Sequence, residues 1–270
     1  MPAMNKTAFS KLFPFGSHLC REPMPPMTEM LRDMETLKRH GFNLIKLQEN
    51  WMVDEPVEND VRLERYDELI AHAARLDLGI YLGLTCEQAP GWLWRKHPDC
   101  RMIGRNGLPM AYEAQTTLPC DGKPGPCYDH PGARADMLRF IARLVTTLGR
   151  HENIVVWNTW QEIGYWSEHL IGQGVCYCPN TIRFYQEWLK SRFAGDLDAI
   201  NKAWNTRYAG WDAVVPERSV KQQFCAQEIA WNFFMDNIQI ARVLSERAAV
   251  IRENDPLRRH YQWRAGSWID

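Results

Sequence analysis

One segment decides the predicted fold: Ile154-Val155-Val156-Trp157-Asn158-Thr159-Trp160-Gln161-Glu162-Ile163-Gly164. It is an apolar run that ends abruptly in an amide, a carboxylate and a glycine. Such a run is typical of a buried parallel strand, and a (β/α)8 barrel carries its catalytic groups at the carboxyl ends of its strands. The segment therefore predicts an α/β fold of the (β/α)8 TIM-barrel type, with Glu162 as the first candidate for a catalytic residue.

The rest of the chain repeats this pattern on both sides of the segment. Short apolar runs alternate with amphipathic stretches, as expected for βα units around a parallel sheet. A closed barrel needs eight such units and about five are found, so residues 1–270 are interpreted as the N-terminal portion of one barrel domain. The predicted strands cover 11–18, 43–47, 79–84, the run from 154, and 260–263, and the predicted helices cover 28–40, 63–77, 132–149, 181–193, 197–204 and 223–253.

The composition excludes several classes of partner. A net charge of −1 over 270 residues, without a basic run, argues against nucleic acid and against an anionic membrane surface. No apolar stretch is long enough for a signal peptide or a membrane span. A cytoplasmic protein is expected, in which the eight cysteines are free thiols or metal ligands rather than disulfides. The twelve tryptophans suit either a packed core or a surface on which sugars stack.

Several short motifs occur in a fixed order along the chain. They are GFNLIK at 41–46, WMVDEP at 51–56, APGWL at 89–93 with KHP at 96–98, CYCP at 176–179, WLK at 188–190 and the segment 197–208. In this order they resemble the catalytic domain of glycoside hydrolase family 42, the β-galactosidases, within the clan A retaining glycosidases. The resemblance covers residues 15 to about 216.

The resemblance implies roles for two neighbouring residues. Clan A enzymes end the fourth strand with Asn-Glu, in which the Glu is the general acid/base, so that role passes to Glu162. A retaining glycosidase uses one carboxyl to protonate the leaving oxygen and a second, about 5–5.5 Å away, as nucleophile. Gln161 stands in place of the Asn that binds the sugar 2-hydroxyl. The family's nucleophile lies on its seventh strand, and no residue of this chain is assigned to it.

The same resemblance suggests further contacts with a carbohydrate substrate. Gln161 and Trp160 flank the proposed acid, Glu55 belongs to the Glu-Pro turn, and Tyr208 falls where the family places an aromatic residue lining the sugar subsite. For Glu55 a residue of the turn itself is the favoured interpretation, ahead of a sugar ligand. Family members are often trimers, so a homo-oligomer is also implied.

A metal site is suggested only in part. Some family members hold a structural zinc with four cysteines, and Cys127, Cys176 and Cys178 match three of them, whereas Thr181 takes the fourth position. Zinc favours a closed tetrahedron, which here would need a water or a histidine such as His130 or His169. Because the ligand set is incomplete, reduced thiols without any cofactor are the expectation.

Three interpretations of function remain open from the sequence. The first is a β-galactosidase-like retaining hydrolase that cleaves terminal β-linked galactose. The second is a clan A hydrolase of another glycone, such as a β-glucoside or an arabinoside, because Gln161 is one methylene longer than the family's Asn. The third is a truncated, catalytically inactive fragment that lacks the nucleophile.

Overall fold

A parallel sheet whose strands follow one another in chain order forms the centre of the protein. The computed structural model describes residues 13–20, 24–110, 125–160, 163–165, 174–218, 225–257 and 261–262. Within them every pair of neighbouring strands is parallel and the order is β1-β2-β3-β4-β5. This unbroken order is that of a (β/α)8 barrel, because a doubly wound sheet would reverse its order at a switch point. The strands are β1 (Gly16–Cys20), β2 (Leu44–Gln48), β3 (Gly79–Gly83), β4 (Ile154–Asn158) and β5 (Tyr261–Gln262).

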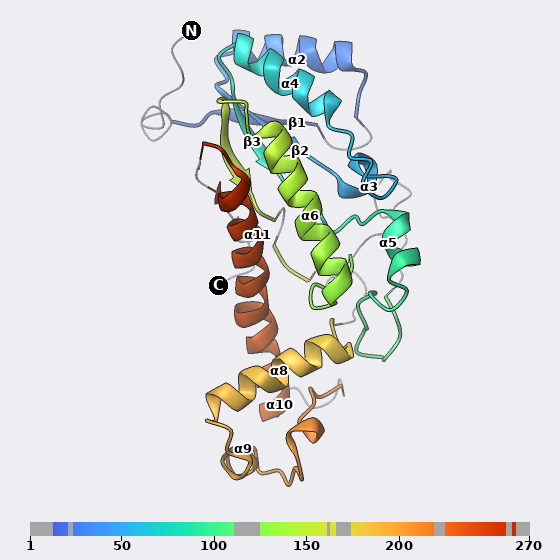
Figure 1. The fold of residues 1–270 in the computed structure, drawn as a ribbon. Coiled ribbons are helices and arrows are strands. Elements are labelled where there is room, and N and C mark those ends of the chain that lie inside the picture. The colour runs from blue at the N-terminus through green and yellow to red at the C-terminus, as the bar shows by residue number, and fades with distance from the viewer. Residues whose placement is uncertain are drawn as a thin grey trace.

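Helices connect successive strands, as parallel pairing requires. Figure 1 shows α2 and α4 together at one end of the molecule, and α6 and α11 side by side along it. The connecting helices are α2 (Met27–Arg39), α4 (Glu64–Arg75), α6 (Pro131–Leu148), and, between β4 and β5, α8 (Pro179–Arg192), α9 (Leu197–Trp204), α10 (Ala226–Phe233), the π-helix η2 (Phe234–Gln239) and α11 (Ile240–Asn254).

Local sequence explains where the helices nearest the strand ends begin. Pro131 opens α6, and the Nδ1 atom of His130 accepts the Ala133 backbone N–H at 3.1 Å. In α8 a proline again follows the N-cap, which is Cys178. Proline suits the first helical turn because the N–H that it lacks would have no partner there. Both helices therefore start at fixed points just beyond the loops that lead away from β3 and β4.

The structure corrects several sequence-based boundaries. The first strand begins at Gly16 rather than at residue 11, and residues 13–15 are not in the strand. Pro14 lacks a backbone N–H, which disfavours it in a sheet ladder. The long helix predicted for 223–253 is three segments, because six residues of π-helix separate α10 from α11. Three short helices were not predicted: α3 (Trp51–Asp54), α5 (Gly91–Lys96) and the 3-10 helix η1 (Trp211–Ala213).

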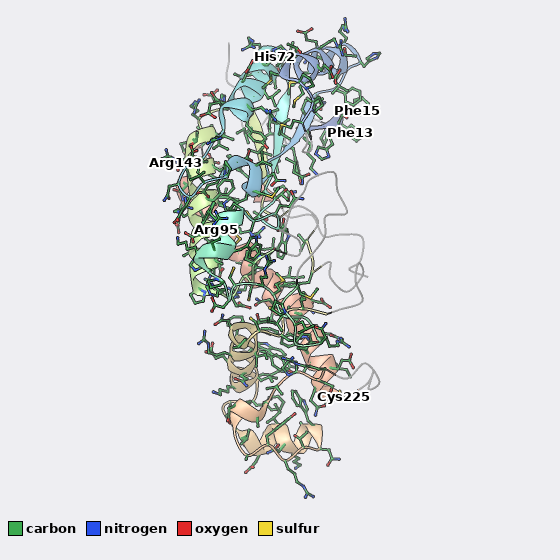
Figure 2. The ribbon with its side chains drawn as sticks, turned by 90° about the vertical axis from the view of Figure 1, so that its right-hand side faces the viewer. Phe13, Phe15, His72, Arg95, Arg143 and Cys225 are labelled. Atoms are coloured by element: carbon green, nitrogen blue, oxygen red, sulfur yellow. The ribbon has the colours of Figure 1, made fainter. Side chains whose placement is uncertain are left out.

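The buried apolar residues form two clusters. The larger one lies between the sheet and the helices α2, α4, α6 and α11. The smaller one belongs to the helical end of the molecule, where Figure 2 places Cys225, opposite the end that carries Phe13 and Phe15. No helix among the described residues is long and apolar enough to cross a membrane. The smaller cluster consists of Tyr177, Tyr185, Leu189, Ile200, Val214, Trp231, Phe234 and Met235.

Candidate functional site

The carboxyl end of β4 leads into a buried aromatic cluster. Trp160 follows the strand by two residues and has no exposed surface. Its ring lies edge-on to those of Tyr128 and Tyr165, at 5.1 and 6.2 Å between centroids. Burial raises the pKa of both tyrosines above the ordinary value, with the charge of Glu87 as the next cause for Tyr128 and that of Asp129 for Tyr165. The carboxyl end of β4 therefore lies against a wall of aromatic rings.

Gln161 and Glu162 come directly after this wall and lie outside the described residues. Their roles as sugar ligand and acid/base therefore stay predictions. The structure does fix the strand that precedes them, since Asn158 and Thr159 are completely buried at its end. A residue four positions after β4 starts from the edge of the sheet where barrel enzymes place catalytic groups.

A buried arginine joins the ends of two strands at this edge. Arg247 of α11 has no exposed surface and donates to the backbone carbonyl of Thr159 at 3.1 Å. Both its terminal nitrogens lie 3.3 Å from the Oε1 atom of Glu87, in the loop after β3. Its guanidinium also stacks on Trp160 and Tyr128, with 4.7 and 5.2 Å from Cζ to the ring centroids. The arginine thus connects helix, loop and strand behind the predicted catalytic position.

A second buried acid, Glu49, follows β2. One of its oxygens accepts the Thr85 backbone N–H at 2.5 Å. Burial raises the pKa of Glu49 well above its ordinary value, and the nearby carboxylate of Asp54 raises it further, whereas the Arg247 charge lowers it only weakly. Glu49 is therefore held in its protonated form more strongly than a surface glutamate, which would make it a hydrogen-bond donor.

Three buried polar atoms at the ends of β2 and β4 have no hydrogen-bond partner among the described residues. They are Glu49 Oε2, Thr159 Oγ1 and Trp160 Nε1. Buried polar groups of folded proteins are almost always hydrogen-bonded. The edge of the sheet at β2 and β4 therefore carries polar groups that the described framework does not use.

Glu55, expected as a sugar ligand, belongs to the framework instead. Its carboxylate is completely buried and accepts three hydrogen bonds: from Trp51 Nε1 at 2.8 Å, from the Asn59 backbone N–H at 2.8 Å and from Arg139 at 2.7 Å. The oxygens are occupied by the α3 turn and by α6. The alternative interpretation, a residue that holds the Glu-Pro turn, is the one that these contacts support.

Tyr208 lies in the helical part of the molecule. Its ring packs edge-on against Trp204 at 6.5 Å, its backbone N–H donates to Asn201 at 2.7 Å, and its hydroxyl accepts from Gln227 at 3.4 Å. These contacts all belong to the α9 and α10 region. A contact between Tyr208 and a sugar stays a prediction.

The three cysteines come together from two distant loops. Their sulfur atoms lie within 4.8 Å of one another, and those of Cys127 and Cys178 are 3.3 Å apart. Burial raises the pKa of the Cys176 thiol to about 12, whereas hydrogen bonds from the Cys127 and Cys176 thiols lower that of Cys178. Two backbone N–H groups point at sulfur, from Ile103 to Cys176 at 3.3 Å and from Thr181 to Cys178 at 3.4 Å.

This donor set fits a zinc ion at three corners. A tetrahedral zinc with Zn–S bonds of about 2.3 Å separates its sulfur ligands by about 3.8 Å. In the cluster the three sulfur atoms lie within 4.8 Å of one another, with the pair Cys127 and Cys178 at 3.3 Å. His130 is not the fourth ligand, because its Nδ1 atom caps α6 and its Nε2 atom lies 3.2 Å from Asp99. His169 lies outside the described residues. Cys127, Cys176 and Cys178 are thus the residues that would hold the metal, and its chemistry would be structural.

Sequence reasoning missed Arg247 as a member of this edge. The sequence does carry a signal for Arg247. It falls on the same face of α11 as the buried residues Val243, Leu244 and Ile251. A charged residue on an apolar helix face is rarely buried unless it has a partner of opposite charge. For Glu49 the sequence shows only an acid after a strand. Its burial depends on Thr85 and α11, which are distant in sequence.

Comparisons with known proteins give one consistent result. The model of the glycoside hydrolase 42 family, described as beta-galactosidase, matches residues 24–262. The beta-galactosidase LacZ of Heyndrickxia coagulans is 26% identical over 226 residues, which cover 80% of this chain and 31% of that protein. The beta-galactosidase BgaA of a Thermus species is 25% identical over 184 residues, 68% of this chain and 26% of that protein.

A solved structure shows the same fold. A catalytic mutant of Gan42B, a GH42 beta-galactosidase from G. stearothermophilus, superposes with a TM-score of 0.76 at 19% identity, covering 93% of this chain and 35% of that one. The five parallel strands and their helices therefore correspond to part of a TIM barrel. The chain spans between a quarter and a third of the length of these curated relatives, 26% and 31%.

Proposed function

The chain belongs to the glycoside hydrolase 42 family of β-galactosidases, and from that membership we propose that it takes part in the hydrolysis of terminal β-linked galactosides with retention of configuration. The substrate is a carbohydrate. One observation carries the proposal beyond the family match: β4 lies inside the parallel sheet with its carboxyl end buried against Trp160, and Glu162 follows two residues later.

In this proposal Glu162 moves a proton twice. As an acid it protonates the glycosidic oxygen while a second carboxylate attacks the anomeric carbon, and as a base it then takes a proton from the water that releases the sugar. The general acid needs a raised pKa, and an apolar wall beside it favours the protonated form. Trp160, Tyr128 and Tyr165 supply such a wall at the end of β4. The nucleophile is not assigned to a residue of this chain.

Arg247 and Glu87 act behind the wall as positioning residues. The bond from Arg247 to the Thr159 carbonyl holds the backbone three residues before Glu162, and Glu87 holds the arginine. Catalytic groups need such rigid support, because misplacement by about 1 Å can cost about a hundredfold in rate.

The test compares two leaving groups in Glu162→Gln, made in the protein that the complete reading frame encodes. We expect hydrolysis of lactose, whose leaving group needs protonation, to fall by about 100-fold to 10,000-fold. Hydrolysis of a dinitrophenyl β-galactoside should fall much less at the first, galactosylation step. With Glu162→Ala, azide should restore turnover and give the β-galactosyl azide, because the anion needs no general base.

Glu152→Gln is the matched control, since Glu152 is exposed and stands before the opposite end of β4. It should leave both substrates unaffected. Two results together would remove Glu162 from the acid/base role. They are an equal loss of activity on lactose and on the dinitrophenyl galactoside in Glu162→Gln, and no β-galactosyl azide from Glu162→Ala.

A different glycone is favoured by one residue, Gln161. If its longer side chain only misplaces the bond to the sugar 2-hydroxyl, Gln161→Asn should raise the kcat/KM for galactosides by about tenfold, about 1.4 kcal/mol of transition-state binding. A loss on galactosides, with β-glucosides or arabinosides as the better substrates of the native protein, would assign Gln161 to that other sugar. The measurement is kcat/KM on a panel of nitrophenyl glycosides.

Two further properties complete the proposal. A cytoplasmic location is supported by six free cysteines among the described residues, five of them buried, which suit a reducing compartment. A homo-oligomer, a trimer by family resemblance, is checked by light scattering on the purified protein.

A further inference from the structure

Gln48, the last residue of β2, carries its amide on the face of the sheet that points away from the larger apolar cluster. Successive side chains of a strand point to opposite faces. Ile45 and Leu47 are completely buried in the larger cluster, whereas Lys46 and Gln48 are only half-buried. In a barrel the helices lie outside, so the face opposite to them lines the lumen. Gln48 therefore belongs to the lumen face.

The lumen face of β2 becomes polar toward the carboxyl end of the strand. Its first residue, Leu44, is apolar, and Lys46 and Gln48 follow it on the same face. The Nζ atom of Lys46 lies 5.7 Å from the centre of the Tyr81 ring on β3. Barrel lumens are packed mainly by apolar side chains, and active sites form at the carboxyl ends of the strands. Gln48 thus occupies a position at which a barrel strand carries a ligand-binding group.

A neighbouring loop fixes the orientation of the Gln48 amide. Its Nε2 atom donates to the Thr85 hydroxyl at 2.8 Å. Thr85 is itself buried, and its backbone N–H donates to Glu49 at 2.5 Å. Within the part of the chain that the structure describes, the Oε1 atom of Gln48 makes no hydrogen bond. An amide with one committed donor and an available acceptor suits the recognition of a hydroxyl group.

Gln48 stands level with the end of the strand that leads to Glu162. In the register of the sheet Gln48 is the partner of Gly83, and Gly83 is the partner of Asn158 at the end of β4. Because Gly83 has no side chain, β3 adds none to this layer. With one strand between them, the backbones of Gln48 and Asn158 lie about 10 Å apart. Gln48 therefore faces the same end of the lumen as the acid/base strand, but not from beside it.

From this position we propose that Gln48 determines sugar specificity by accepting a hydrogen bond from a hydroxyl of the terminal sugar. The inference rests on the proposed function and names a further contact of that site. Gln48 belongs to a strand and not to a loop, so it meets the sugar unit that enters deepest. Its partner is a hydroxyl at C3, C4 or C6, because the C2 hydroxyl lies beside the anomeric carbon, where Glu162 acts.

The experiment measures kcat/KM of Gln48→Met in the protein that the complete reading frame encodes. The substrates are a nitrophenyl β-galactoside and its 3-, 4- and 6-deoxy analogues. Methionine is unbranched and similar in length but does not replace the amide, so only the polar contact is lost. We expect kcat/KM for the galactoside to fall about tenfold.

The deoxy analogues identify the hydroxyl. On the analogue that lacks the partner of Gln48, the substitution should add no further loss, because the contact is already missing. On the other two analogues it should cost the same factor as on the galactoside. This pattern distinguishes a hydrogen bond to the sugar from a general disturbance of the barrel, which would lower all four values alike.

Two further variants separate recognition from structure. Thr85→Val removes the hydroxyl that orients the amide, and it should give a smaller loss that vanishes on the same deoxy analogue. Gln186→Met is the matched control, because the Gln186 amide donates to backbone carbonyls of the helical end, at Asp212 and Val214. It should leave all four values unchanged. Circular dichroism checks that each variant is folded.

Binding of a non-hydrolysable β-thiogalactoside, measured by calorimetry, gives a readout that does not depend on hydrolysis. Gln48→Met should weaken this binding by about tenfold, in the native background and in Glu162→Gln alike. Unchanged binding, or equal losses on the galactoside and all three deoxy analogues, overturns the role of Gln48. If the deoxy pattern holds while the leaving-group test of Glu162 fails, the acid/base assignment is wrong and the specificity contact stands. A folded native protein that neither binds nor hydrolyses galactosides overturns both proposals.

Discussion

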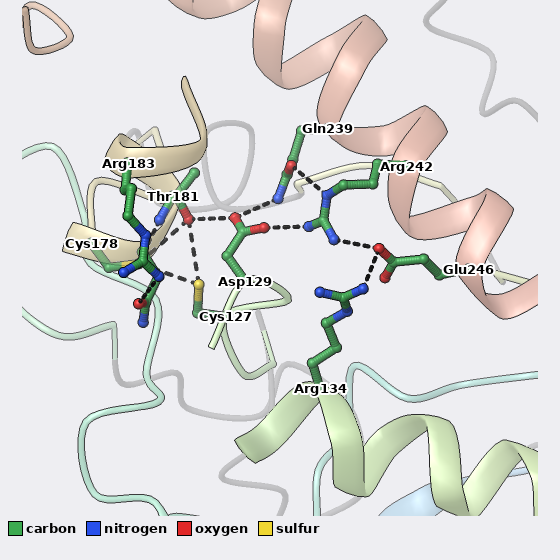
Figure 3. Close-up of polar contacts among 10 residues, drawn as sticks. Cys127, Asp129, Arg134, Cys178, Thr181, Arg183, Gln239, Arg242 and Glu246 are labelled. Carbon is green, nitrogen blue, oxygen red and sulfur yellow. Dashed lines mark hydrogen bonds and ion pairs between the residues drawn. The ribbon is translucent and has the colours of Figure 1, made fainter. Parts of the chain in front are cut away.

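Two arginines on one helix bind acids from loops that follow β3, yet their surroundings differ. Arg247 pairs with Glu87 and has no exposed surface, whereas Arg242 pairs with Asp129 and keeps 16% of its side chain exposed. Arg247 is enclosed by aromatic rings and a backbone carbonyl. Arg242 belongs to a chain of charges that continues through Glu246 (Figure 3).

The difference shows how burial sets the energetic role of an ion pair. A fully buried pair gains little over an apolar replacement of the same shape, because both charges lose their water, but removal of one partner leaves the other charge uncompensated. A pair with several partners and some solvent access can rearrange when one member is lost. The pair at Arg247 is therefore expected to fix geometry at the end of β4, and the network at Arg242 to adapt.

The largest effect is expected for Arg247→Met. The substitution removes the donor of the buried Thr159 carbonyl and leaves the Glu87 carboxylate with the Tyr128 hydroxyl, 3.4 Å away, in place of its charged partner, at a cost of about 3–5 kcal/mol in the free energy of unfolding. Urea denaturation followed by circular dichroism measures it. Adding Glu87→Gln to the variant should recover part of the loss, because it removes the stranded charge. A loss below about 1 kcal/mol would mean that water reaches Glu87 and that the pair is not truly buried.

A smaller effect is expected for Arg242→Met. Asp129 keeps Gln239 and Thr181 as donors, and Glu246 keeps Arg134, so the cost should be about 1–2 kcal/mol. The dependence on salt concentration should also differ between the two variants. Raising ionic strength should reduce the cost at Arg242, which is partly exposed, and leave the cost at Arg247 unchanged. Equal costs with equal salt dependence would erase the distinction between the two sites.

The sequence predicts the sheet well because its strands carry their own signals. Each of β2, β3 and β4 is an apolar run, and their predicted ranges differ from the observed ones by a residue or two where residues are described. The π-helical segment between α10 and α11 has no such signal, because its extra residue per turn depends on packing of Phe234 and Met235 in the smaller cluster.

The polar site is less predictable, because its contacts join distant residues. The three cysteines were recognisable as a set, and the structure brings them together. The pairing of Thr181 with Asp129 spans 52 residues, and that of Arg242 with Asp129 spans 113. No local sequence pattern predicts either pairing. Glu55 shows the converse: a motif residue that looks like a ligand, but whose oxygens are taken by its own turn and by α6.

The smallest effect on stability is expected for a substitution of Glu49. It tests which acid balances the charge of Arg247. Glu49 faces Asp54, Glu87 and Arg247, and its pKa is raised chiefly by burial. Arg247 makes its ion pair with Glu87 and not with Glu49, so Glu49 is expected to be protonated. A carboxyl whose pKa is higher in the folded state stabilises the fold below its unfolded pKa and loses that contribution as pH rises through the folded pKa.

Glu49→Gln cannot ionise and keeps an oxygen for the Thr85 N–H. Relative to the native chain, its free energy of unfolding should therefore rise with pH above the ordinary range of a glutamate, by at most about 1.4 kcal/mol per pH unit, and level off above the folded pKa. Urea denaturation of both proteins from pH 5 to 8 measures the gap. Glu68→Gln, at an exposed position of α4, is the control and should show no such trend. Parallel stability curves for Glu49→Gln and the native chain would mean that Glu49 is ionised in the fold, and that Arg247 then compensates both acids.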